Sequence, residues 1–159
     1  GVNVPYIHMG GKIGVLVNLA VDGGIDATEI GKNVAMQIAA LNPRFWDKSQ
    51  VTQDVLDEEK EVMLGQMAND PKMAGKPDQV KEKIVMGKLN KFYAENCLLQ
   101  QAFVKDGDVS VEQYMNNAAK ALGGKVSFNT AVRFEKGEGI EKKQENFAAE
   151  IASMVSGNK

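Results

Sequence analysis

A stretch near the start of the chain alternates between apolar side chains and mostly small or polar ones. Its apolar positions share one parity: Ile13, Val15, Val17, Leu19 and Val21. Because successive side chains of a β-strand point to opposite faces, this period of two predicts a strand with one strongly apolar face. The β-prone run Tyr6 to Met9 and the glycine pair Gly10–Gly11 precede it, so we expect residues 5–21 to form a β-hairpin.

A second alternating run lies near the other end of the chain. One parity of this run carries Val126, Phe128, Thr130, Val132 and Phe134, which are apolar except for Thr130. We expect a half-buried strand here, whose apolar face matches that of the hairpin. A three-stranded antiparallel sheet is the simplest assembly of these strands.

Apolar residues at spacings of three and four predict helices that pack on this sheet. The first series is Ile30, Val34, Ile38 and Leu41. Asp26 and Glu29 have the spacing of a capping box before it, with Thr28 as the alternative cap, and Asn42–Pro43 ends it. We also expect a short helix at 110–122 and a last helix at 141–155, which makes the fold class α+β.

The middle of the chain predicts an inserted antiparallel helical hairpin, a coiled-coil arm. Two helices, at 52–69 and 78–98, flank a turn with prolines at both ends, Pro71 and Pro77. The second helix carries a narrow apolar seam: Val85, Leu89, Phe92, Asn96 and Leu99. Such a seam favours an arm that projects from the body, and two helices packed flat on the core remain the alternative.

We therefore expect three parts in the chain. Residues 1–51 and 98–140 form a core α+β subdomain, residues 52–97 form the inserted hairpin, and residues 141–159 form a C-terminal helical module. In 159 residues, a formal net charge of -2 gives no global attraction to nucleic acid or to an anionic membrane. No apolar run approaches the roughly 20 residues that span a bilayer, so we expect a soluble, cytoplasmic protein.

The chain offers little reactive chemistry. Its one cysteine, Cys97, is expected to be a small buried group, and its one histidine, His8, excludes most histidine-based zinc sites on a single chain. We find no catalytic motif and no cluster of metal ligands, and we expect neither an enzyme nor a cofactor.

Several blocks of sequence resemble bacterial elongation factor Ts, in the order in which that family carries them. They are residues 6–16 (YIHMGGKIGVL), 34–43 (VAMQIAALNP), 88–93 (KLNKFY), 101–105 (QAFVK), 132–142 (VRFEKGEGIEK) and 147–150 (FAAE). The family's small N-terminal helical domain and its Thr-Asp-Phe motif have no counterpart in this sequence. We therefore expect the chain to be the C-terminal, dimerisation-domain portion of such a factor.

The resemblance implies a guanine-nucleotide exchange factor that binds the GTPase elongation factor Tu and performs no bond chemistry. It implies no small-molecule substrate and no membrane, and a homodimer is among the assemblies it allows. His8 matches the family histidine that presses on the GTPase domain. Tyr6, Met9 and Gly10 are its neighbours and are further candidate contacts with the partner. Phe147, Ile151 and Met154 have the spacing of core residues in the last helix, but the family's terminal helix docks on the GTPase, so the resemblance makes them candidate partner contacts as well.

Two other functions remain as alternatives. An RNA- or ribosome-associated module would use four lysines of the arm: Lys81, Lys83, Lys88 and Lys91. Because Asp78, Glu82 and Glu95 are interleaved with them, nucleic acid is not the expected partner. A hydrolase acting through Cys97 is the other alternative.

Overall fold

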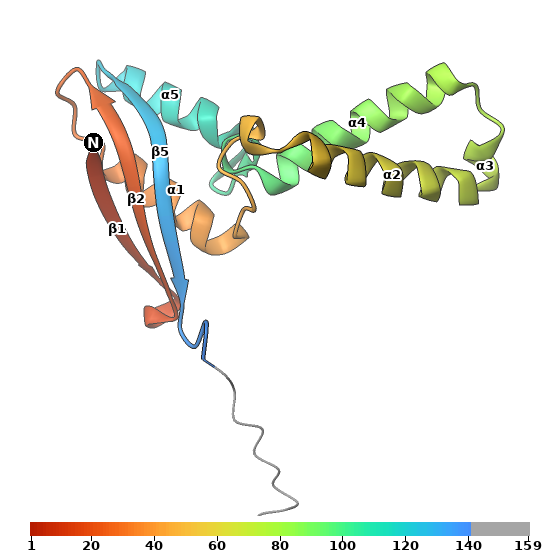
Figure 1. Ribbon diagram of the computed structural model, residues 1–159. Helices are drawn as coiled ribbons and strands as arrows, with labels where there is room; N and C mark the ends of the chain where they lie inside the picture. Colours follow the sequence, from red (N-terminus) through yellow and green to blue (C-terminus); the bar gives the residue numbers. More distant parts are fainter. Residues whose placement is uncertain (141–159) are drawn as a thin grey trace, which may run out of the picture.

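A computed structural model describes residues 1–140, and its centre is a three-stranded antiparallel sheet. The strands are β1 (Val2–His8), β2 (Ile13–Asp22) and β5 (Lys125–Glu135), in the order β1-β2-β5 (Figure 1). This confirms the predicted sheet. The hairpin begins three residues earlier than expected, because Val4 is buried beneath the first helix and continues the apolar face of β1.

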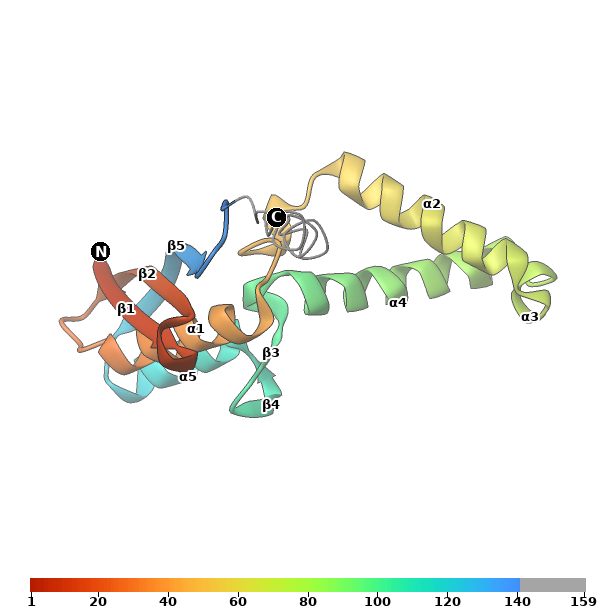
Figure 2. The same ribbon diagram turned by 90° about the horizontal axis from the view of Figure 1, so that it is seen from below.

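Helices α1 (Thr28–Leu41) and α5 (Val111–Ala121) pack on the same face of this sheet (Figure 2). Val15, Val17 and Leu19 of β2 form the sheet side of the core. The helices contribute Ile30, Val34, Ile38, Val111, Met115 and Ala119. The helical face predicted for α1 is therefore the buried face. Within residues 1–140, no helix covers the opposite face of the sheet.

The predicted start of α1 is wrong. The N-cap residue is Ala27, which makes no side-chain cap, and the Asp26 carboxylate instead accepts hydrogen bonds from the backbone and hydroxyl of Thr28. The predicted end is confirmed, because Asn42 adopts a left-handed conformation just before Pro43.

A β-bulge changes which side chains of β5 are buried. The pairing with β2 shifts between Asn18 and Leu19, which pair with Thr130 and Phe128, so Asn129 is an extra residue. Beyond the bulge the parity is reversed. Val132 and Phe134, predicted on the buried face, are exposed, and Ala131 and Arg133 take the inner positions.

The inserted hairpin projects from the body (Figure 1), so the alternative of two helices packed flat on the core is wrong. It consists of α2 (Gln53–Asn69), the short α3 (Pro71–Ala74) and α4 (Asp78–Asn96). Where α3 lies, the sequence pattern predicts only a turn. Met63, Met67 and Val85 form a small apolar cluster within the arm, and none of the helices described is long and apolar enough to cross a membrane.

The root of the arm, where α2 begins and α4 ends, is held to the core by two loops. Phe45 and Cys97 form a parallel β-bridge, and the Asp47 carboxylate accepts hydrogen bonds from Ser49 and from Gln100 Nε2, the latter at 2.8 Å. A second, two-stranded sheet of β3 (Ala102–Phe103) and β4 (Asp106–Ser110) follows, and sequence analysis did not predict it. From there a capping box of Ser110 and Gln113 begins α5.

Asp47 should make the root of the arm sensitive to acid. Burial acts to raise the pKa of this carboxyl, but hydrogen bonds from Ser49 and Gln100 outweigh it and hold the pKa below its usual value. A lowered folded-state pKa stabilises the protein above the unfolded-state pKa, and this stability is lost as the pH falls through the folded-state value. We expect the wild type to be more stable than Asp47→Asn at pH 7, by less than about 1 kcal/mol, and the difference to shrink as the pH falls below about 4.

Urea denaturation of both proteins between pH 3 and pH 7 measures this difference. Asp108→Asn, which removes an exposed carboxylate from β4, serves as the control and should show no comparable pH dependence. A difference between wild type and Asp47→Asn that stays constant across this range would contradict the assignment.

The predicted last helix and the C-terminal module at 141–159 lie outside the described residues. The division of the chain into three parts remains a prediction.

Candidate partner-binding site at the tip of the first hairpin

The turn between β1 and β2 is built from three consecutive residues with positive φ. These are Met9 at 51°, Gly10 at 63° and Gly11 at 91°. Glycine adopts such angles without steric cost, whereas methionine does so at a cost on the order of 1 kcal/mol. The turn exposes the Met9 side chain at the tip of the hairpin.

His8 and Tyr6 lie on one face of β1, two residues apart, directly before this turn. The Tyr6 hydroxyl and His8 Nδ1 are 3.0 Å apart, and the ring centroids are separated by 5.7 Å. Tyr6 is partly buried against the main core, so the contact ties the imidazole to the body of the protein. The structure thus places Tyr6, His8, Met9 and Gly10 together at one tip, as the sequence predicts; their contact with a partner remains a prediction.

Arg133 lies on this same face of the sheet and was not predicted there. It follows Tyr6 and Val15 in the cross-strand row Tyr6–Val15–Arg133. Its Nη1 atom is 3.2 Å from a Glu135 carboxylate oxygen, and its Nε atom is buried without a hydrogen-bond partner in the described part of the chain. Alternation alone assigned Arg133 to the solvent face, and the bulge at Asn129 reverses that assignment.

Comparison with known proteins shows which family the chain belongs to. The family model described as "Elongation factor TS" matches residues 1–138. This chain belongs to the elongation factor Ts family.

Elongation factor Ts proteins of two clostridia illustrate the relationship. The Clostridium botulinum protein (strain ATCC 19397 / Type A) is 46% identical over 160 residues, which cover 100% of this chain and 51% of the relative. The Clostridium kluyveri protein (strain ATCC 8527) is 44% identical over 158 residues, with 99% and 50% covered. The chain therefore spans about half the length of the curated relatives it matches, and the predicted resemblance is confirmed.

The open face of the sheet in this elongation factor Ts chain carries an apolar patch, which we call the outer-face patch. It consists of Pro5, Ile7, Leu16, Val132 and Phe134. Ile7 and Phe134 are 67% and 66% exposed, and they flank Gly14 in one cross-strand row. Contiguous exposed apolar side chains of this kind are typical of protein interaction surfaces.

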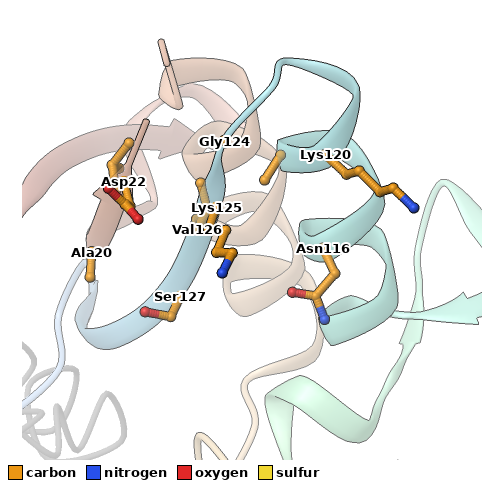
Figure 3. A pocket seen from close by; sticks show the side chains of 10 residues that line it. Ala20, Asp22, Asn116, Lys120, Gly124, Lys125, Val126 and Ser127 are labelled. Carbon is orange, nitrogen blue, oxygen red and sulfur yellow. The ribbon is translucent and has the colours of Figure 1, made fainter. Parts of the chain in front are cut away.

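A hollow of about 720 Å³ lies at the opposite end of the sheet from the tip (Figure 3). It is an open depression lined by the end of β2, the start of β5 and α5. The side chains of Lys125, Asn116 and Ser127 are directed into it, whereas Lys120 extends away along the outside of α5. The hollow shares no residue with the tip and has neither histidine nor cysteine in its wall, so it adds nothing to the predicted partner site.

Cys97 is fully buried at the root of the arm, in a cluster with Val51 and Phe92. Burial, with a smaller contribution from the Asp47 carboxylate, raises the pKa of the thiol to about 11. A thiol that stays protonated is a poor nucleophile, which argues against the hydrolase alternative and agrees with the expected small buried group. The other predicted partner residues, Phe147, Ile151 and Met154, lie outside the described residues.

Proposed function

We propose that this protein binds elongation factor Tu as part of a guanine-nucleotide exchange factor in cytoplasmic translation. The observation that carries this proposal is the match of residues 1–138 to the elongation factor Ts family, with 44–46% identity to proteins of that name. The placement of His8 at an ordered, projecting tip supports it, because the resemblance assigns the partner contact to this histidine.

Exchange of this kind needs no reactive group. An exchange factor that binds the empty GTPase better than the loaded one lowers the affinity of the GTPase for nucleotide. Bound nucleotide lowers the affinity of the GTPase for the exchange factor by the same ratio. A nucleotide held with nanomolar affinity is bound by about 12 kcal/mol, so the factor must supply a substantial difference in contact energy between the two states. A tip whose shape is fixed before binding loses little conformational entropy in the complex, so more of its contact energy remains as binding energy.

His8→Ala should weaken binding to nucleotide-free elongation factor Tu by about tenfold, because it removes the side chain that the resemblance places against the GTPase. Affinity capture on immobilised nucleotide-free elongation factor Tu, at several concentrations of this chain, measures the change. Lys120→Ala, at the opposite end of the sheet, is the control and should bind like the wild type. Equal binding by wild type and His8→Ala would contradict the role of the tip.

A polypeptide of these 159 residues should bind elongation factor Tu but accelerate the release of a fluorescent GDP from it only weakly, because the sequence contains no Thr-Asp-Phe motif. Release as fast as that produced by a full-length family member would contradict this part of the proposal.

The RNA-associated alternative has less support. Helix α2 is the partner of α4 in the arm, and its charged side chains are Asp54, Asp57, Glu58, Glu59, Lys60 and Glu61. Because this acidic helix packs beside α4, the arm lacks the continuous basic track that backbone phosphates require.

We further propose that the outer-face patch joins two copies of the chain into a homodimer. Its five residues carry no charge, so a second copy related by a two-fold axis meets no like-charge repulsion there.

Phe134→Lys should weaken dimerisation at least about tenfold, since it would bury an unpaired ammonium. Light scattering during size-exclusion chromatography measures the mass. Met86→Lys, which changes an equally exposed residue of the arm, should remain dimeric; a monomeric wild type would refute the homodimer.

A further inference from the structure

We propose that Tyr6 is a positioning residue for His8: its hydroxyl donates a hydrogen bond to Nδ1 and thereby places the proton of the neutral imidazole on Nε2, directed at an acceptor oxygen of the partner. This inference rests on the proposed function for the identity of the partner. It assigns Tyr6 a role different from direct contact, which is the role that the sequence predicts.

The geometry fixes the two side chains relative to each other. His8 has extended backbone angles, φ -114° and ψ 147°, so the side chains of residues 6 and 8 project from the same face of β1. The 3.0 Å separation of the hydroxyl oxygen and Nδ1 is that of a hydrogen bond. Since Tyr6 packs against the core, its hydroxyl is a fixed reference point, whereas His8 lies at the edge of the turn.

The chemistry of the two groups decides which one donates. A neutral imidazole carries one proton, so one ring nitrogen donates and the other accepts. The phenol O–H is a good donor, while its oxygen is a weaker acceptor because a lone pair is delocalised into the ring. The favoured arrangement is therefore O–H to Nδ1, which leaves the proton on Nε2, the ring nitrogen that takes no part in this bond.

The nearest charged groups on this face do not compete for the imidazole. The cross-strand row of His8 continues through Ile13 to Glu135. The Glu135 carboxylate is paired with Arg133 at 3.2 Å, so it is held toward the neighbouring row. Within the described residues 1–140, Tyr6 is thus the side chain in direct hydrogen-bond contact with His8, and we infer that the tautomer depends on it.

The chain contains one histidine, so its imidazole nitrogens give a single pair of ¹⁵N resonances. At the alkaline plateau of a pH titration, the wild type should show a protonated Nε2 and a bare Nδ1, with well-separated shifts. Tyr6→Phe keeps the ring and removes the hydroxyl, and the two shifts should move toward each other as the tautomers mix. Tyr93→Phe, on the arm, should leave the spectrum unchanged. A wild type protonated on Nδ1, or a Tyr6→Phe spectrum like that of the wild type, would overturn the proposal.

Binding separates positioning from direct contact. Tyr6→Phe should weaken binding to nucleotide-free elongation factor Tu about fivefold, the worth of one ordinary hydrogen bond, and should have no further effect when His8 is already alanine. An equal loss in both backgrounds would show that the hydroxyl touches the partner itself and would overturn the positioning role. If no variant binds elongation factor Tu, the proposed function fails, while the spectrum of the free protein still decides the tautomer.

Discussion

Gly31→Ala should lower the free energy of unfolding by about 3 kcal/mol, because α1 crosses β1 at this residue with no room for a methyl group. A Cβ atom built at Gly31 would meet Val4, with its Cβ at 2.7 Å and its Cγ1 at 3.0 Å, and would overlap its Cγ2 even more closely. Val4 is 2% exposed and is held in β1 by its pairing with Val17, so it cannot move aside cheaply. Either the helix shifts away from the sheet or the strand bends.

Gly65→Ala is the matched control, and it should have the opposite sign. Gly65 lies inside α2 with nothing within 4 Å of an added Cβ. Alanine there restricts the unfolded chain and should stabilise the helix by about 0.5–1 kcal/mol. Urea denaturation of both variants measures the two changes, and a Gly31→Ala protein as stable as the wild type would show that α1 does not approach β1 so closely.

Gln37→Met should cost about 3 kcal/mol, although it preserves the length of the side chain. Gln37 is fully buried, and its amide donates to Gln101 Oε1 at 3.2 Å and to the Ala102 carbonyl at 3.0 Å, while its oxygen accepts from Val104 N at 2.8 Å. Methionine would leave these three groups without their partner, and each unsatisfied buried polar group costs about 1–3 kcal/mol.

Gln37→Met should destabilise the residues around this hydrogen-bond network as well as the protein as a whole. Gln101 also donates to the Glu95 carbonyl near the end of α4, so this network joins α1 to the root of the arm. In Gln37→Met, we expect hydrogen exchange to accelerate most at the Val104 amide. Gln66→Met, on the exposed face of α2, should change neither the stability nor the exchange rate appreciably. Equal stability of the two variants would contradict the buried network.

Periodicity predicts the elements of this fold well where one face is buried against the core. The alternation at 13–21 identifies β2, and the apolar series from Ile30 to Leu41 identifies α1, because burial imposes the period of the element on the sequence. The same logic misassigns Val132 and Phe134, since one extra residue at Asn129 reverses the parity and nothing in the alternation marks that residue. The alternation does not identify the small β3–β4 sheet, because β3 has two residues and β4 is largely polar.

The candidate site was predicted from the resemblance rather than from residue chemistry. A single histidine beside a glycine turn is commonly an ordinary exposed residue, and the family match is what gives His8 a partner. The Tyr6–His8 hydrogen bond could have been anticipated, because residues two apart share a face of a strand. The approach of Arg133 to that face could not, because it depends on the bulge.

The most direct test of a factor that works by preferring the empty GTPase is isothermal titration calorimetry of this chain against elongation factor Tu in two states. We expect binding to the nucleotide-free protein at least about tenfold tighter than to the GDP-bound protein, within the usual range of coupling between two ligands. Equal affinity for both states, or no binding to either, would contradict the account.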